Sequence, residues 1–309
     1  MLVIAVAVPM WISVSVAATW TRAADMLTAR SAHAAVATDR AIYVLAGTGP
    51  DGKPVTTVER FDGRAWMNDT TLPGEGLNAP AAAAIGNSIY LIGGFGTTTN
   101  RPVAAVHRYD TLAKTWSDAS PLPAPRGGHA AAVLNGRIHV FGGGNSVSTI
   151  DDHSVYDPKT NTWSAAAPLP RKMGSPAAAV VNGKLYSIGG RSGPIDFGDV
   201  HIYDPSTDRW TPGAAIPARG TAGAAVLAGS IYLFGGESQS AKAVLGDVLR
   251  LVPSASEWMR ETAPMPIPRK YARALVFNGV VYILGGSTEF GASHSSRGAT
   301  IVDRFDPAR

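Results

Sequence analysis

The side chains best suited to chemistry in this chain are arginines that recur at one position of an internal repeat. They are Arg30, Arg126, Arg171, Arg219 and Arg269, with Asn78 at the corresponding place in a sixth unit. A guanidinium group presents a planar fork of donors that matches a carboxylate or a phosphate. We therefore expect these six residues to share one rim and to bind an anion. The alternative is a structural role, in which they bond to carbonyl and carboxylate groups of the repeat itself.

Carboxylates on the same side of the repeat are few. Glu237 directly follows one of the repeated glycine pairs, so we expect it to lie beside the arginines. A lone carboxylate next to a basic cluster can act as a general base. It can equally be a loop charge paired with an arginine, and the sequence leaves both interpretations open.

Composition narrows the remaining chemistry. The chain has no cysteine, and therefore no disulfide, zinc knuckle or thiol nucleophile. The 7 histidines show no compact metal-ligand spacing, so we expect no metal and no cofactor. The net charge is +4, but there is no run of Lys or Arg, and we expect no nucleic-acid partner.

Two independent series of residues set the spacing of these side chains. Tryptophan recurs in steps of 46, 50, 47, 47 and 48 residues, at Trp20, Trp66, Trp116, Trp163, Trp210 and Trp258. A second series keeps the same spacing. It is a glycine pair in five units, at Gly93-Gly94, Gly142-Gly143, Gly189-Gly190, Gly235-Gly236 and Gly285-Gly286, and Ala46-Gly47 in the other. A period of roughly fifty residues with these markers is typical of propeller blades.

The third unit shows the strands that one blade requires. Residues 129–134 predict an inner strand, and Asn135-Gly136 predicts a tight hairpin, because both turn positions need positive φ. Residues 137–143, 153–158 and 162–170 predict the second, third and outer strands. The other units fit the same template, so the chain is predicted to be all-β, with six blades of four antiparallel strands each.

The two ends of the chain predict how the ring closes. The sixth unit stops at Asp306-Pro307-Ala308-Arg309, before its tryptophan strand begins. The segment Thr19-Trp20-Thr21 resembles that missing strand. We therefore expect the N-terminal strand to complete the last blade, which removes free sheet edges. Residues 19–309 are predicted to form one domain and a monomer.

These glycine pairs, aromatic-Asp pairs such as Tyr156-Asp157 and spaced tryptophans resemble the Kelch-repeat family over residues 19–309. The resemblance implies a six-bladed propeller but does not by itself give a function. Variable loops on a rigid scaffold are the usual binding site. We expect a non-catalytic binding protein that uses the loop face around the central channel for an anionic ligand, an acidic glycan or a protein segment.

A second, local resemblance supports an enzymatic alternative. The segment from Gly220 to Val226, followed by Gly235-Gly236-Glu237, is similar to exported N-acetylneuraminate epimerases, the sialic acid mutarotases. The resemblance implies that Glu237 would be the proton acceptor. The family pattern also has an arginine a few residues later, whereas this chain has Lys242 and no arginine in that stretch.

The N-terminal segment predicts export. Residues 1–18 are apolar and uncharged, and Val16 and Ala18 suit a signal-peptide cleavage site, although the usual basic start is missing. The alternative is an uncleaved membrane anchor, the only case in which we expect contact with a membrane. The predicted location is periplasmic or extracellular.

Overall fold

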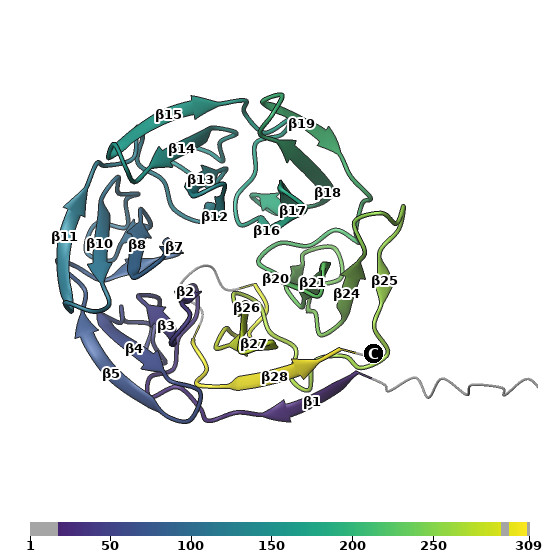
Figure 1. Ribbon diagram of the computed structural model, residues 1–309. Coiled ribbons are helices and arrows are strands. Elements are labelled where there is room, and N and C mark those ends of the chain that lie inside the picture. The colour runs from purple at the N-terminus through teal and green to yellow at the C-terminus, as the bar shows by residue number, and fades with distance from the viewer. Residues whose placement is uncertain (1–17, 292–296, 308–309) are drawn as a thin grey trace, which may run out of the picture.

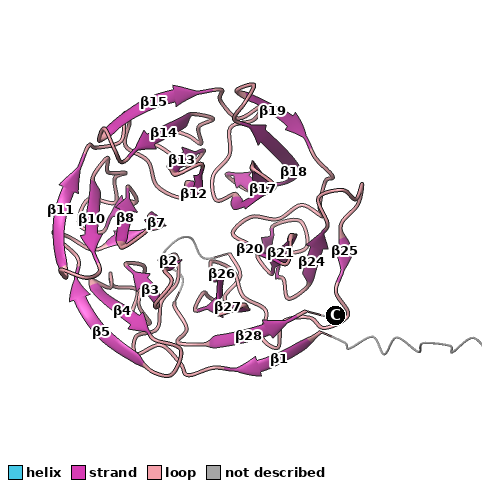
Figure 2. Cartoon of the chain, viewed as in Figure 1, coloured by secondary structure: helices cyan, strands magenta, loops and turns pink. Residues whose placement is uncertain are grey.

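Six four-stranded antiparallel sheets are arranged around one axis. The strands of each sheet are ordered from the centre to the rim (Figure 1). The computed structural model describes residues 18–291 and 297–307, and within these ranges every regular element is a strand (Figure 2). The predicted all-β, six-bladed propeller is confirmed.

In the first three blades the strands follow one another from the inner to the outer position in chain order. Blade one consists of β2 (Ala34–Ala37), β3 (Ile42–Leu45), β4 (Thr57–Phe61) and β5 (Trp66–Thr71). Blade two consists of β7 (Ala81–Ile85), β8 (Ser88–Ile92), β10 (Val106–Asp110) and β11 (Thr115–Ala119). Blade three consists of β12 (Ala130–Leu134), β13 (Arg137–Phe141), β14 (His153–Asp157) and β15 (Thr162–Ala166).

The last three blades repeat this order, and the sixth borrows its outer strand from the start of the chain. Blade four consists of β16 (Ala177–Val181), β17 (Lys184–Ser192), β18 (Ile195–Asp204) and β19 (Arg209–Pro212). Blade five consists of β20 (Gly223–Leu227), β21 (Ser230–Phe234), β24 (Val248–Leu251) and β25 (Met259–Arg260). Blade six consists of β26 (Arg273–Phe277), β27 (Val280–Leu284), β28 (Val302–Asp306) and β1 (Thr19–Arg22).

The ring closes as the ends of the sequence predict. Strand β1 pairs antiparallel with β28, with Trp20 opposite Phe305. The aromatic side chains of Trp20 and Phe305 also pack together, with their ring centroids 4.8 Å apart. Because β1 completes the last blade, the first and last blades are joined. Closed propellers protect their sheet edges in this way.

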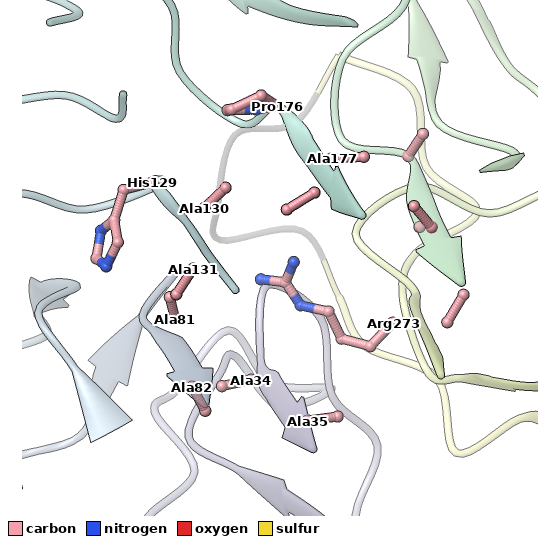
Figure 3. Close-up of a pocket in the computed structure, with 15 residues that line it drawn as sticks. Ala34, Ala35, Ala81, Ala82, His129, Ala130, Ala131, Pro176, Ala177 and Arg273 are labelled. Atoms are coloured by element: carbon pink, nitrogen blue, oxygen red, sulfur yellow. The ribbon is translucent and has the colours of Figure 1, made fainter. Parts of the chain in front are cut away.

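The inner strands are rich in alanine because six of them crowd around one axis. Residues such as Ala35, Ala82 and Ala131 face the central channel, where a larger side chain would fill the lumen (Figure 3). The second strands are apolar on both faces, as in β3 and β8, which are buried along their whole length. Residues of neighbouring blades form the core between them; Tyr43, for example, packs with Ile89 and Tyr109.

The repeated glycine pair ties each blade to the next. Gly143 has a φ of +96° and donates its N–H to the carbonyl of Met173 in blade four, at 2.9 Å. The equivalent bond, from the Gly286 N–H to the Arg30 carbonyl, joins blade six to blade one. A Cβ on Gly142 would stand 2.7 Å from the Met173 carbonyl oxygen, which explains the need for glycine there.

Two short two-stranded ladders lie in the loops. One pairs β6 (Leu77–Asn78) with β9 (Phe95–Gly96), and the other pairs β22 (Glu237–Ser238) with β23 (Ala243–Val244). Within the described ranges, the fold has no helix able to cross a membrane. The predicted signal segment, residues 1–18, lies outside these ranges except for Ala18, so its cleavage stays a prediction.

Candidate functional site

One face of the propeller carries both the loops between second and third strands and the connections from one blade to the next. Isolated bridges join them, for example Gly127 with Gly144, Gly174 with Arg191, and Gly220 with Glu237. We call this the loop face. Its connections reach the mouth of the channel, so residues from several blades can act on one ligand there.

Four of the predicted arginines lie on this side, but their guanidinium groups are buried and bonded inside their own blades. Arg30, Arg126, Arg219 and Arg269 are at most 2% exposed. Arg219 bonds to both oxygens of Asp247, at 2.7 and 3.0 Å, and to the Gly235 carbonyl. This geometry matches the structural alternative, in which the arginines bond to carbonyl and carboxylate groups of the repeat itself.

The other three members of the buried set make similar bonds. Arg30 donates to the Ala46 carbonyl and to Glu59 at 2.8 Å. Arg269 donates to the Ile301 carbonyl and to Asp303 at 2.5 Å. Arg126 donates to the carbonyl oxygens of Gly142 and Asp152. Burial lowers the pKa of Arg269 to about 10, and Asp303 partly offsets that effect.

The expectation that Arg171 and Asn78 share this repeat position is wrong. The glycine-pair N–H bonds identify Leu77 and Met173 as the equivalents of Arg30 in blades two and four. Arg171 lies two residues before Met173 and therefore outside the repeat position. Its side chain is half exposed and pairs with Asp199 at 2.9 Å. Asn78 falls one residue late, and its side-chain oxygen accepts a bond from the Thr48 hydroxyl.

Glu237 is fully buried and holds the centre of a polar cluster formed by three blades. Arg191 from blade four donates to Oε1 at 3.0 Å, and Lys270 from the connection to blade six bonds to Oε2. Gln239 donates to Oε1, and the Gly291 N–H approaches Oε2 at 3.2 Å. All of these donors converge on one carboxylate, and they balance a charge that would otherwise be costly to bury.

Residues in and beside this cluster have shifted pKa values, and one of them has an unusual backbone conformation. Burial lowers the pKa of Lys270, an effect that Glu237 partly offsets, and burial raises the pKa of Asp196. Tyr271 bonds to Arg191 through its hydroxyl and has a φ of +53°, which is rare for a bulky residue. Such strain persists only where surrounding contacts fix it, and it often accompanies a functional site.

Beside this cluster the loop face is hollowed. A pocket of about 440 Å³ is lined mainly by backbone and small side chains of blades three and four, with Phe95 and Gln239 at its edge. A second hollow shares Phe95 and Asn145 with it. The charged residues that line the two hollows are both arginines, Arg191 and Arg101. We call the two together the loop-face groove.

Three exposed apolar side chains stand at the rim of this groove. Val147 is 91% exposed and lines the pocket directly. Ile195, at 60%, is the first residue of β18, and Phe290, at 39%, lies in the loop after β27. The glycines near them, Gly193 and Gly291, line the pocket. Large apolar side chains that project from loop tips around a hollow are typical of a surface that another molecule covers.

Below the groove, a ring of six left-handed residues narrows the mouth of the channel. Each blade contributes one, and they are Ala32, Ala79, Gly128, Ser175, Thr221 and Tyr271, with φ between 46° and 63°. The N–H of Ala79 donates to the Ala32 carbonyl and that of Gly128 to Ala79, and the series continues through Ser175 and Thr221 to Tyr271. The channel beneath is a cavity of about 120 Å³ into which Arg273 projects (Figure 3).

Two histidines of blade three are part of the core. His139 and His153 are buried in blade three and share a hydrogen bond of 2.9 Å between Nδ1 and Nε2. Burial lowers the pKa of each to about 4. Among the described residues, no group of three or more potential ligands could hold a metal ion.

Sequence reasoning missed Arg101, Arg191, Lys270, Tyr271 and Arg273 as site residues. Two of these carried a readable signal. Arg191 directly follows its glycine pair, as Glu237 does one blade later, so the two face each other across neighbouring blades. Arg273 begins an inner strand where every other blade has alanine or glycine. The partners of Lys270 and Tyr271 depend on blade-to-blade packing, which no local pattern gives.

A closed six-bladed propeller with its cluster on the loop face defines the class of protein, and sequence comparison gives the family. The KLHDC2/KLHL20/DRC7 Kelch-repeats domain matches residues 32–213 and, in a second placement, 79–286. The chain therefore belongs to the Kelch-repeat family, consistent with a protein-interaction role.

Individual relatives match only part of this chain. Alpha-scruin of Limulus polyphemus is 35% identical over 129 residues, which is 40% of this chain and 14% of that protein. Kelch-like protein 35 of Mus musculus is 31% identical over 137 residues, 43% of this chain and 23% of that protein. The matched regions thus span less than a quarter of either relative.

A solved structure supports the fold over nearly the whole length. The structure of YjhT superposes with a TM-score of 0.78, covering 91% of this chain and 95% of that one, at 19% identity. At this identity the likeness extends to the propeller fold alone.

Proposed function

We propose that this protein is a Kelch-repeat binding module whose loop-face groove holds an acidic, partly apolar segment of a partner protein. The observation that carries the proposal is the charge of the groove: its charged lining residues, Arg101 and Arg191, are both cations. The apolar rim of Val147, Ile195 and Phe290 would cover the flanking apolar residues of the segment. Aromatic and arginine side chains are also the usual anchors of protein interfaces.

The two arginines make different contributions. Arg191 is held by Glu237 and Tyr271, so its position is fixed before any ligand arrives. Preorganisation of this kind lowers the entropic cost of binding. Arg101 is exposed in its loop, where a cation chiefly steers an acidic partner and sets the salt dependence of binding.

The proposal is tested with a peptide array of short acidic segments that contain two or three apolar residues. Selected peptides would be titrated by fluorescence anisotropy against the wild type and against Arg101→Gln. We expect the variant to bind several-fold more weakly and to lose part of the salt dependence. The matched control is Arg209→Gln, an exposed arginine on outer strand β19, which should bind like the wild type.

Two outcomes would contradict the proposal. One is a panel in which no acidic peptide binds above its neutral counterpart. The other is equal loss of binding in Arg101→Gln and Arg209→Gln, which would indicate only a general dependence on net charge. Binding of acidic glycans but of no peptide would indicate that the groove binds a carbohydrate and not a partner protein.

We also infer that the mature protein is exported and monomeric. The first described strand, β1, begins at Thr19, directly after the predicted cleavage site, so removal of the leader would leave the closing strand intact. N-terminal sequencing of the protein from its native host tests this, and a start at Thr19 is the expected result. A start at Met1 in the membrane fraction would favour the anchor instead.

A sialic acid mutarotase is a second candidate, and one observation favours it. The stretch after Glu237 lacks the expected arginine, but Arg191 from the neighbouring blade supplies one at 3.0 Å, beside the groove. A base must, however, have a free oxygen lone pair, and each carboxylate oxygen of Glu237 already accepts two bonds. If this protein is a mutarotase, it should accelerate the exchange between sialic acid anomers that NMR detects. The Glu237→Gln variant should remain folded and lose that effect.

A further inference from the structure

Arg273 stands where the symmetry of the propeller calls for a small residue. It is the first residue of inner strand β26. The residues at this place in the other five blades are Ala34, Ala81, Ala130, Ala177 and Gly223. Figure 3 shows the Arg273 side chain reaching into the lumen among alanine methyl groups. Five small residues therefore make room for one guanidinium group.

The orientation of this guanidinium group is fixed by a single bond. Its Nε donates to the His33 carbonyl oxygen at 2.6 Å. Neither terminal nitrogen, Nη1 nor Nη2, has a hydrogen-bond partner among residues 18–291 and 297–307. The lining of the cavity contains alanine, glycine and proline together with His129, and it includes no aspartate or glutamate.

The charge of Arg273 is thus held away from any carboxylate. Burial lowers the pKa of Arg273 to about 10, and the phenol of Tyr271 partly offsets that shift. At neutral pH the group remains a cation. The four buried arginines of the loop face have carboxylate or carbonyl acceptors at their terminal nitrogens, for example Asp247 on Arg219. Arg273 differs from them because its fork points into open space.

We propose that the central channel is a binding site for one small planar oxyanion, a short-chain carboxylate or nitrate, held end-on by Nη1 and Nη2 of Arg273. Since Nε is already bonded to His33, the two terminal nitrogens form the remaining fork, and two oxygens of a carboxylate match it. A cavity of about 120 Å³ admits such an ion with a few waters.

An access route runs from the loop face. A small void of about 20 Å³ lies between the groove and the channel. It shares Gly128 and Ser175 with the groove, and His129 and Arg273 with the channel. Entry therefore passes through the ring of left-handed residues. The proposed site is separate from the groove and does not depend on the partner segment proposed above.

The test uses acetate as the probe, observed by saturation-transfer NMR on its methyl group after the protein has been dialysed into fluoride buffer. The wild type should transfer saturation to acetate, and nitrate should displace it. In Arg273→Ala the apparent dissociation constant should rise at least tenfold. This variant should fold, because alanine occupies the same place in four other blades. Arg209→Ala, which changes net charge equally at the outer rim, should leave acetate binding unchanged.

A second variant and a second readout keep the result interpretable. Arg273→Lys retains a cation but lacks the planar fork, so nitrate and acetate should both bind more weakly than to the wild type. Acetate should also raise the wild-type Tm at constant ionic strength, as any ligand of the folded state does, and should leave the Tm of Arg273→Ala unchanged. Equal saturation transfer in the wild type and in Arg273→Ala would overturn the proposal, as would its absence from both.

Discussion

Arginine has three distinct roles in this molecule, and its surroundings decide which one applies. Arg219 and its equivalents are buried and bonded within a blade, Arg191 is held beside the groove, and Arg273 points into the channel. The residue type alone predicts affinity for anions. Whether that affinity is used by the protein itself or left for a ligand depends on the acceptors that the fold places nearby.

The structural role of the buried arginines predicts a large difference between two substitutions. Arg219→Gln should lower the free energy of unfolding by roughly 3 kcal/mol, because Asp247 would stay buried without its bidentate partner. Arg171→Gln should change it by less than about 0.5 kcal/mol, because that ion pair is solvent-exposed. Urea unfolding of both variants makes the comparison, and equal effects would contradict the structural assignment.

The buried histidines predict a loss of stability in acid. The pKa of His139 and of His153 falls from 6.5 to about 4 on folding, so the unfolded chain binds more protons between these values. Their contribution is therefore complete above pH 6.5 and is lost as the pH falls to about 4. The free energy of unfolding, followed by urea titration, should decrease by a few kcal/mol across this interval.

A double variant isolates this contribution. Other blades carry tyrosine at the place of His139, as in Tyr90, and valine at the place of His153, as in Val106. His139→Tyr with His153→Val should therefore fold and show a shallower decrease between pH 6.5 and 4. An unchanged slope would mean that other groups, such as His33 and His129, control the acid transition.

At the scale of the element, the outer strand depends on its tryptophan for contact with the preceding blade. The indole N–H of Trp163 donates to the Ser120 carbonyl at 2.8 Å, and four other blades repeat this bond. The regular spacing of tryptophan thus reflects a connection between blades as well as apolar packing. Trp116 is the exception, because its indole nitrogen has no partner in the described chain.

This exception supplies a matched control for a second stability prediction. Trp163→Phe should cost about 1 kcal/mol more than Trp116→Phe, because only the former leaves a carbonyl without its donor. Both variants lose similar aromatic area, so the difference isolates the hydrogen bond. Thermal or urea unfolding measures it, and identical losses would show that the bond contributes no net stability.

For the whole molecule, closure of the ring is the feature on which the shape depends. Strand β1 brings Trp20 between Phe234 and Phe305, far away in sequence. Trp20→Ala should lower the free energy of unfolding by roughly 2–4 kcal/mol, since half-buried aromatic area and one indole bond are lost together. Retention of full stability by this variant, measured by calorimetry, would contradict closure through β1.

Much of the fold could be predicted from the sequence, whereas little of the site could. Blade number, strand order and closure follow from the tryptophan and glycine series, because each marker makes a contact that repeats with the blade. Residue type was the wrong guide in blades two and four, where it placed Asn78 and Arg171 at the position that Leu77 and Met173 occupy. The cluster around Glu237 depends on side chains from three blades, and its partners arise only from packing.

The most direct measurement of the central claim, that the loop-face groove binds a partner segment, is a cross-linking footprint. A peptide selected for binding would carry a photoreactive group, and mass spectrometry would locate its attachment points on the protein. Attachment to the loops around Arg101, Val147 and Ile195 is the predicted result. Attachment to outer strands such as β11 and β15, or to the face opposite the loops, would contradict the account.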